Sequence, residues 1–543
     1  MQLSRYFCTA GVLAGTFFFA LSLTPMLLPR SDVVQGVISG LSLAAGYGLG
    51  VFGRWLWRYL ELPIPRSHVK WGVQLAAAFV CVIIAVAFLW QASTWQNTVR
   101  GLMGMEETDG LQPLVVGGVA LLLFAAVLLL SKLFRRTILL LSGKLQRFIS
   151  RPVSNVVGLL VAFFLFWSVI DGIFFEFALR AADRSYQQVD ALMEAEVEKP
   201  IAPTKTGSTE SLANWSALGR QGRRFISSGP TAADLADYFD SAPVKEPLRV
   251  YIGINSADTP EDRAALALEE LKRVGAFDRS VLLLITPTGT GWVDPAGMDT
   301  VEYLHRGDIA SVAVQYSYLP SILSLLLEGE YGSETARSLF EVVYAYWTAL
   351  PKESRPALYL YGVSLGALNS DRSFDLYDII DDPFQGALWC GPPFRSDTWR
   401  KVTERRQPDS PARLPVFRNG SVVRFANQET KLDALDQEWG DFRIAYLQYA
   451  SDPVTFFEPQ AFFREPQWMR EPRGPDVSPD LQWFPIVTGL QLIADVVAGS
   501  APPGYGHIFA AGHYIDAWRA LTEPPQWSEN ELQRLREYFD TES

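Results

Sequence analysis

The sequence predicts a two-part α/β protein, with a five-helix transmembrane domain at residues 1–176 and a doubly wound, mostly parallel α/β domain at 247–543. The first part contains five long apolar runs and carries 13 basic and 7 acidic side chains. The rest of the chain holds 34 of its 47 basic and 52 of its 59 acidic side chains. Beyond residue 247, short β-branched runs alternate with helical stretches, which is typical of a βα series. Residues 177–246 form the predicted helical connector, with a polar, flexible linker at 201–212.

Each of the five apolar runs is long enough to cross a bilayer as a helix. About 20 residues at 1.5 Å each span the ~30 Å hydrocarbon core. Glycines are frequent in the second run, as expected where helices pack closely in lipid. A cleaved signal peptide in place of the first run is the less favoured alternative, because four more runs follow. The runs lie at 7–28, 33–53, 71–90, 111–131 and 153–175.

The charges of the short loops predict how these spans are oriented. Loops 54–70 and 132–152 are strongly basic, whereas loop 91–110 has one arginine and three acidic residues. Because basic loops stay in the cytoplasm, both basic loops and the N-terminus are expected there. Five crossings then place the larger domain outside. The prediction is a multi-pass protein of the inner (cytoplasmic) membrane with an extracytoplasmic C-terminal domain.

The composition also restricts the partners and cofactors. A net charge of −12 argues against a nucleic-acid partner, which requires a basic face. Three cysteines exclude a disulfide scaffold and a cysteine-rich metal site, and four histidines leave few ways to build a metal centre. We therefore expect the lipid bilayer as a partner, with no metal and no organic cofactor. The sequence makes no prediction of the oligomeric state.

Six apolar runs predict the strands of the sheet. Their near-continuous apolar character indicates parallel strands covered on both faces, and right-handed crossovers then give a doubly wound sheet. Residues 459–480 contain five prolines and predict an irregular excursion over the surface. The strands are expected at 249–254, 281–286, 311–318, 357–363, 386–390 and 443–450.

The fourth predicted strand leads directly into Gly362-Val363-Ser364-Leu365-Gly366. In the pattern G-x-S-x-G, the serine occupies a strained strand-to-helix turn, and its neighbours are small because larger side chains do not fit. The pattern alone is a weak signal, but its position at the end of a strand in a βα series favours Ser364 as a nucleophile. A glycine-rich turn with a solvated serine is the alternative.

A nucleophilic serine needs a histidine as base and an acid to orient it, here expected in the order serine, acid, histidine. Asp452 follows the last predicted strand, at the edge of the sheet where ligands bind. His507 lies in a glycine-rich loop and is favoured over His513, which is expected to begin the next helix. The less favoured candidates are Asp381, Asp382 and Asp495 for the acid, and His68 and His305 for the base.

Two backbone N–H groups should form an oxyanion hole. One is expected from Leu365, the residue after the nucleophile. The other is expected from the loop 287–292, where Gly291 is favoured but not separated from Thr290. A plain turn is the alternative interpretation of this loop.

Eight segments give the sequence a more specific resemblance. The chain resembles a largely uncharacterised bacterial family of membrane-anchored α/β-hydrolases with an N-terminal multi-span domain. This resemblance implies the α/β-hydrolase fold and a catalytic role for Ser364, Asp452 and His507. Val363 stands where the family has an acidic residue, and Tyr505 where it has a further histidine. The segments are GRQGRRFISSGPTA (219–232), TPTGTGWVDP (286–295), GDIASVAVQYSYLPS (307–321), YGVSLGAL (361–368), ALWCGPPF (387–394), YLQYASDPV (446–454), WFPIVTGLQ (483–491) and GYGHIFAAGHYIDAW (504–518).

Together these features predict a membrane-anchored serine hydrolase of the esterase or lipase type. Its substrate is expected to be an ester of an envelope lipid or of an acylated glycan, because the domain is tethered beside the bilayer. Three alternatives remain open: an acyltransferase that uses the same acyl-enzyme, a non-catalytic envelope binding module with this fold, and a five-span transporter with an accessory domain. The lack of paired intramembrane charges counts against the transporter.

Overall fold

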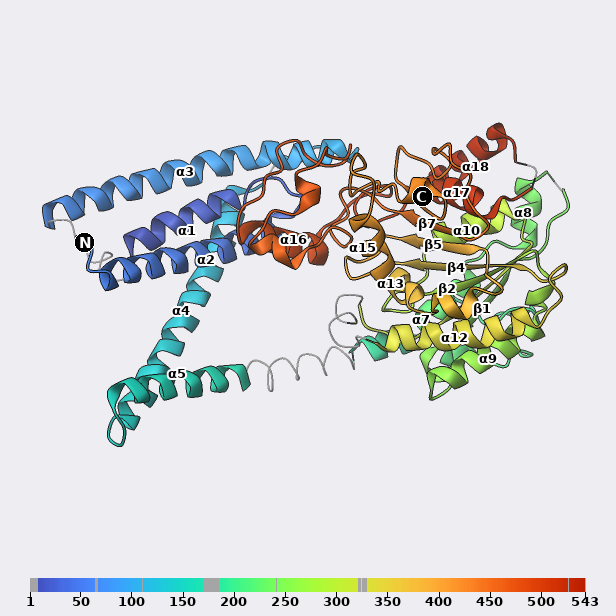
Figure 1. Ribbon diagram of the computed structural model, residues 1–543, viewed down its shortest axis with the longest axis horizontal. Helices are drawn as coiled ribbons and strands as arrows, with labels where there is room; N and C mark the ends of the chain where they lie inside the picture. Colours follow the sequence, from blue (N-terminus) through green and yellow to red (C-terminus); the bar gives the residue numbers. More distant parts are fainter. Residues whose placement is uncertain are drawn as a thin grey trace. The chain divides into compact units, whose positions relative to one another are not determined.

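The computed structural model describes residues 8–63, 67–109, 111–168, 185–240, 242–320, 324, 330–525 and 527–542 (Figure 1). The chain divides into two compact units. The membrane unit comprises residues 1–182 and 458–501, and the hydrolase unit comprises 183–457 and 502–543. These boundaries differ from the sequence-based ones in two places. The connector belongs to the hydrolase unit, and a segment from within the C-terminal domain belongs to the membrane unit.

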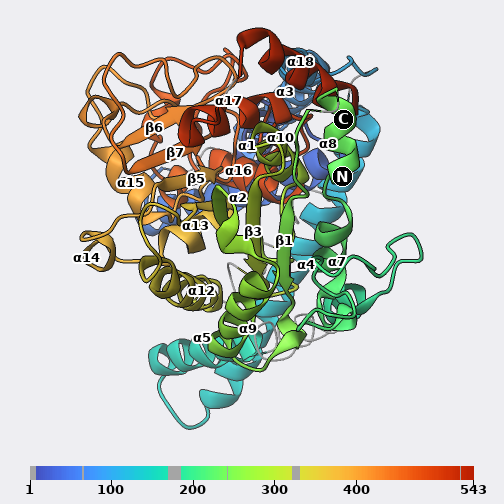
Figure 2. The ribbon, with the colours of Figure 1, turned by 90° about the vertical axis from the view of Figure 1, so that its right-hand side faces the viewer.

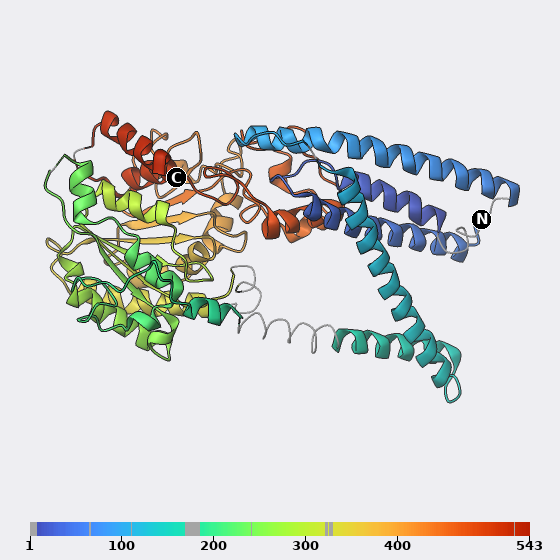
Figure 3. The same cartoon turned by 180° about the vertical axis from the view of Figure 1, so that it is seen from behind.

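Long apolar helices dominate the membrane unit. Ser31 caps α2 by accepting a hydrogen bond from the Val34 N–H, and prolines begin α4 and α5, where no amide donor is needed. Gly46 of α2 lets the backbones approach, because a Cβ there would lie 2.5 Å from the Ala14 carbonyl oxygen of α1. Figure 3 shows these two helices side by side. The helices are α1 (Thr9–Leu21), α2 (Asp32–Tyr59), α3 (Ser67–Leu102), α4 (Pro113–Leu145) and α5 (Arg151–Trp167).

Three helices of this unit, not five, are long and apolar enough to cross a membrane within the described residues: α2, α4 and the stretch Gly72–Leu102 of α3. The expectation of five spans is corrected in this respect. With 13 residues, α1 extends about 20 Å, less than the ~30 Å of a hydrocarbon core. Helix α1 ends at Leu21, and the rest of the apolar run, to residue 28, is not helical. The described part of α5 ends at Trp167, and residues 169–175 of the predicted fifth run lie outside the described residues.

The segment 458–501 completes the membrane unit. It begins with two short 3-10 helices, η7 (Pro459–Phe462) and η8 (Gln467–Met469), and ends with the apolar helix α16 (Val487–Ala498). Helix α16 packs against α2. The proline-rich stretch 459–480 is irregular apart from η7 and η8, as predicted, and η7 packs against α16 within the membrane unit.

The hydrolase unit contains a seven-stranded, all-parallel sheet in the order β1-β3-β2-β4-β5-β7-β6. Six strands match the predicted runs, although β3 ends at Val314, before the predicted end. The short edge strand β6 was not predicted. The strands are β1 (Leu248–Ile252), β2 (Val281–Thr286), β3 (Ile309–Val314), β4 (Ala357–Val363), β5 (Gly386–Cys390), β6 (Val423–Ala426) and β7 (Arg443–Leu447).

Helices cover both faces of this sheet, which explains why its strands are almost entirely buried (Figures 1 and 2). One layer contains α9 (Pro260–Arg273) and α12 (Tyr331–Thr348), and the other contains α10 (Pro295–Leu304) and α17 (Ala511–Thr522). The remaining helices are α7 (Gly219–Ser227), α8 (Ala232–Tyr238), α13 (Leu365–Asp371), α14 (Leu376–Ile379), α15 (Asp397–Glu404) and α18 (Glu529–Glu542).

The connector is ordered against the hydrolase unit. Thr206 is buried, and its hydroxyl donates to the Arg249 carbonyl oxygen at 3.3 Å. Ser211 Oγ and the Leu212 N–H donate to the Glu270 carboxylate of α9 at 2.7 and 3.0 Å. The prediction of a flexible linker at 201–212 is therefore wrong, because its polar side chains and amides bond to this unit. The apolar and polar pattern of residues 177–200 predicts an amphipathic helix. Residues 177–184 lie outside the described ones, helix is present at 185–191, and residues 192–200 are not helical.

Candidate active site

Ser364 lies at a sharp turn between β4 and α13. Its backbone has φ +57° and ψ −122°, a combination that costs a non-glycine residue conformational energy. The flanking glycines make this turn possible. A Cβ on Gly362 would lie 2.4 Å from the carbonyl carbon of Gly366, and one on Gly366 would lie 2.1 Å from the Thr286 carbonyl oxygen. The local geometry is therefore that of a nucleophile elbow.

Asp452 is fully buried in the loop that follows β7. Its Oδ1 accepts hydrogen bonds from the N–H groups of Val454 at 2.8 Å and Thr455 at 3.3 Å. Its Oδ2 accepts one from Thr455 Oγ1 at 3.1 Å and lies 2.8 Å from His507 Nδ1. These donors compensate the carboxylate for its loss of water and fix its orientation.

His507 presents its two ring nitrogens to different surroundings. Nδ1 faces Asp452, so the carboxylate selects the tautomer in which Nδ1 carries the proton and Nε2 is an acceptor. Nε2 is buried and has no hydrogen-bond partner among the described residues. This arrangement leaves one nitrogen available as a general base.

Gly391, directly after β5, connects the three predicted residues. The Ser364 N–H donates to the Cys390 carbonyl oxygen at 2.9 Å. At the next residue, a Cβ on Gly391 would lie 2.6 Å from His507 Cε1 and 2.9 Å from Asp452 Oδ2. Strand β5 lies between β4 and β7, so Ser364, which follows β4, and the Asp452–His507 pair, beyond β7, lie at the same edge of the sheet, on either side of Gly391. No hydrogen bond joins Ser364 to His507 Nε2 among the described residues. Gly391 was not predicted as a site residue, although a glycine immediately after a buried strand is a feature visible in the sequence.

The less favoured candidates have other partners. His513 Nδ1 lies 2.6 Å from the Tyr449 hydroxyl, and burial lowers the pKa of His513. His305 Nε2 lies 2.8 Å from Thr522 Oγ1, and burial lowers the pKa of His305 to about 4. The side chain of His68 lies outside the described residues. Of the competing acids, Asp382 pairs with Arg355 and Asp495 pairs with Arg30, and Asp381 is exposed.

The two predicted oxyanion donors differ in availability. Leu365 is the first residue of α13, and no side chain caps this helix, so its first amides remain available as donors. The Gly291 N–H, by contrast, donates to the Thr288 carbonyl oxygen at 2.9 Å within its own loop. Its carbonyl oxygen accepts from the Tyr251 hydroxyl at 2.8 Å. The Gly291 amide is therefore already used in its own turn, which favours Thr290, the alternative left open for the second donor.

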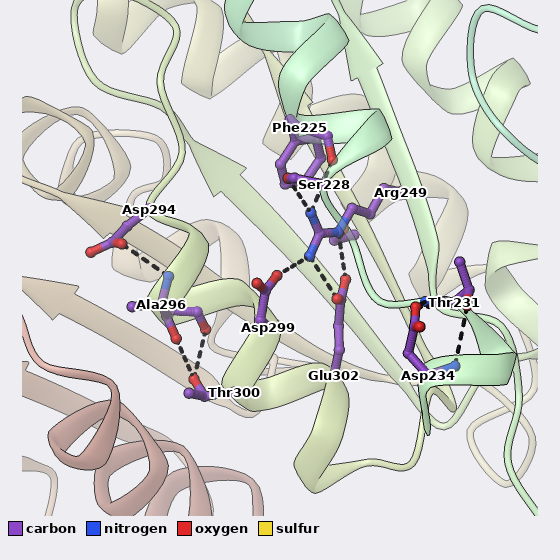
Figure 4. Close-up of polar contacts among 12 residues, drawn as sticks. Phe225, Ser228, Thr231, Asp234, Arg249, Asp294, Ala296, Asp299, Thr300 and Glu302 are labelled. Carbon is purple, nitrogen blue, oxygen red and sulfur yellow. Dashed lines mark hydrogen bonds and ion pairs between the residues drawn. The ribbon is translucent and has the colours of Figure 1, made fainter. Parts of the chain in front are cut away.

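Asp294 follows the loop 287–292 and was not predicted as a site residue. It caps α10 by accepting from the Ala296 N–H at 3.1 Å (Figure 4). Its other oxygen accepts from the Tyr514 hydroxyl at 2.8 Å, and the Tyr361 hydroxyl of β4 donates to Tyr514 at 3.1 Å. Burial raises the pKa of Asp294 to about 6. An aspartate directly before a proline commonly begins a helix, so Asp294 and Pro295 could have predicted the start of α10 from the sequence.

A parallel sheet with a serine at a strand-to-helix elbow, and an aspartate–histidine pair in the loops beyond it, defines the α/β-hydrolase class of protein. The chain belongs to the alpha/beta-hydrolase family, whose model matches residues 248–535. The model of the alpha/beta-hydrolase family N-terminus matches residues 23–230. No curated protein and no solved structure matches the chain. The α/β-hydrolase family predicted from the eight sequence segments, with its N-terminal family region, is thus confirmed, and so is the α/β fold of the C-terminal domain.

Proposed function

We propose that this protein is a membrane-anchored serine hydrolase that cleaves ester bonds. The observation that carries the proposal is the Asp452–His507 hydrogen bond of 2.8 Å, together with His507 Nε2, which has no partner in the described part of the chain. A buried carboxylate that holds one imidazole nitrogen leaves the other ready to accept a proton. The strained backbone of Ser364 supports its role as the nucleophile.

In the proposed mechanism, Ser364 Oγ attacks the ester carbonyl and its proton passes to His507 Nε2. Asp452 stabilises the imidazolium that forms. The N–H of Leu365 and, by preference, that of Thr290 stabilise the negative oxygen. The alcohol leaves with the proton from His507, and an acyl-serine remains. Water, activated by the same histidine, then releases the acid and restores the serine.

We further propose that the hydrolase unit lies outside the inner (cytoplasmic) membrane and acts on an envelope ester. The segment 458–501, which is inserted in the hydrolase sequence, contacts residues 22–28, and the Arg30 N–H donates to Gln96 Oε1 near the end of α3. The basic loop 54–70 is expected in the cytoplasm, so the loops at the far ends of α2 and α3 are expected outside. These are the loops that follow α1 and α3. These contacts support the proposed orientation, because they bring both loops to the side of the inserted segment.

Ester hydrolysis by the purified full-length protein in detergent tests the proposal, with 4-nitrophenyl esters of increasing chain length as substrates. We expect turnover by the wild type and none by Ser364→Ala. The Ser364→Ala protein must show the same thermal unfolding as the wild type for the comparison to count. Transfer of the acyl group to an added glycan faster than to water would replace the hydrolase with the acyltransferase. Inertness of a folded wild type would favour the binding module.

A further inference from the structure

Helix α16 has the reverse of the polarity expected of a helix that faces water. Its polar residues Thr488, Gln491 and Asp495 are at most 2% exposed, whereas Ile493 and Val497 are 41% and 61% exposed. Asp495 is the only charged residue of the helix. A helix on an aqueous surface places charged and polar side chains outward. The outer face of α16 is therefore suited to an apolar solvent.

Asp495, on the inner face of α16, pairs with the buried guanidinium of Arg30 in the membrane unit. Asp495 Oδ1 lies 2.7 Å from Arg30 Nε, and neither side chain is exposed. Asp495 Oδ2 accepts from the N–H groups of Leu27 at 3.1 Å and Leu28 at 3.4 Å. A buried carboxylate requires such partners because it has lost its water.

The same face satisfies backbone groups where the first apolar run stops being helical. Gln491 Nε2 donates to the carbonyl oxygens of Ser22 at 3.2 Å and Thr24 at 3.1 Å. Backbone outside regular helices is tolerated at membrane depth only where protein covers it and satisfies its polar groups. Helix α16 provides this cover for the residues directly after α1.

The outer face of α16 continues a surface that already suits lipid. The helix packs on α2, a candidate span with exposed apolar side chains along its length. With 12 residues, α16 extends about 18 Å, which is too short for a ~30 Å core. It can therefore occupy only one leaflet. Phe463, in the same inserted segment, is 81% exposed.

We propose that α16 is a lipid-contacting helix embedded in one leaflet, with Ile493 and Val497 against acyl chains. The hydrolase sequence thus contributes its own membrane element, separate from the N-terminal helices. The inserted segment begins at Glu458 and ends at Ala501, six residues after Asp452 and six before His507. If the proposed function holds, the lipid contact lies in the chain between the acid and the base, which favours a lipid ester over a glycan ester as substrate.

Spin labelling of the full-length protein in phosphatidylethanolamine–phosphatidylglycerol vesicles tests this proposal. The native Cys8, Cys81 and Cys390 are replaced by alanine, and one nitroxide is attached at Val497→Cys, with Ile493→Cys as a second position. Leu122→Cys on α4 is the lipid-facing control, since this residue is 74% exposed on a candidate span. Glu269→Cys on α9 is the aqueous control, with its side chain 58% exposed. Collisions with oxygen and with a water-soluble nickel chelate are measured at each position.

At 493 and 497 we expect the pattern of position 122, with frequent oxygen collisions and at least fivefold fewer nickel collisions than at 269. Nickel collisions as frequent as at position 269 would overturn the proposal. So would a label that neither reagent reaches, because protein would then cover this face. The measurement does not depend on catalysis. An inactive protein with lipid-facing labels would refute the proposed function alone, and an active protein with water-facing labels would refute the lipid contact alone.

Discussion

Each of the two units buries a carboxylate beside a cationic or ionisable side chain, Asp495 in one and Asp452 in the other, but the remaining partners of these two carboxylates differ. In the membrane unit, Asp495 receives the Arg30 guanidinium and two backbone amides, and this carboxylate links α16 to the residues after α1. In the hydrolase unit, Asp452 holds His507 through one nitrogen and leaves the other without a partner among the described residues. Asp495 and Arg30 form a fully bonded ion pair, whereas we propose that the Asp452–His507 pair transfers protons. Substitutions should therefore lower stability at the first pair and activity at the second.

The largest effect is expected at the histidine of the hydrolase unit. His507→Gln should lower kcat by about 10⁴-fold or more, because no base then remains for Ser364. His513→Gln, the matched control six residues away, should stay within tenfold of the wild type, since His513 bonds to Tyr449 rather than to Asp452. Steady-state hydrolysis of a soluble ester measures both. Equal losses in the two variants would contradict the assignment of the base.

In the membrane unit, the change should appear in stability. Arg30→Met leaves Asp495 buried without its cation and should lower the free energy of unfolding by about 3–5 kcal/mol. The double substitution Arg30→Met/Asp495→Leu should recover much of that loss, because the unpaired charge is gone. Denaturant titration of the full-length protein in detergent gives both values. A double variant as unstable as Arg30→Met would show that the pair is not the reason for the loss.

Asp294 of the hydrolase unit should make stability depend on pH. The pKa of Asp294 is raised from its ordinary 3.8 to about 6 because the group is buried. A raised pKa means that the folded state binds a proton more tightly than the unfolded state does. Protonated Asp294 therefore contributes its full stabilisation below about pH 4, and this stabilisation is lost as the pH rises through 6. Asp294→Asn should remove this dependence, an effect of about 3 kcal/mol at about 1.4 kcal/mol for each pKa unit. Unfolding midpoints between pH 4 and 8 test it, and a slope unchanged in the variant would refute it.

The smallest effect is expected for an exposed pair. Lys272 and Glu269 of α9 lie 2.8 Å apart, but both side chains are at least one-third exposed. Lys272→Met should change the free energy of unfolding by less than about 1 kcal/mol, because water and salt screen such pairs. The same denaturant titration measures this value. A loss comparable to that of Arg30→Met would undermine the distinction between buried and exposed pairs.

Local patterns predicted much of the hydrolase unit. Six strands were evident as continuous apolar runs, and the glycines on either side of Ser364 predicted the tight turn that this residue occupies. Strand β6 was missed because it has only four residues, one of them a buried arginine, Arg424. The use of the Gly291 amide within its own turn could not be foreseen either, because it depends on the conformation of the loop.

Long-range pairing explains the remaining differences. Arg30 and Asp495 are separated by 465 residues, so no local pattern could assign the segment 458–501 to the membrane unit. Similarly, the apolar run at 7–28 predicted a full span, but α1 ends at Leu21 and the next residues bond to α16. Gly391 gains its role only once β4, β5 and β7 are neighbours in the sheet.

The central claim is an activated serine on the outer side of the membrane. Labelling of intact spheroplasts with a membrane-impermeant fluorophosphonate tests it directly, with wild type and Ser364→Ala compared at equal amounts of folded protein. We expect the wild type to be labelled and the variant not. A folded wild type that stays unlabelled both in intact spheroplasts and after lysis would contradict the catalytic role of Ser364, and labelling only after lysis would contradict the orientation.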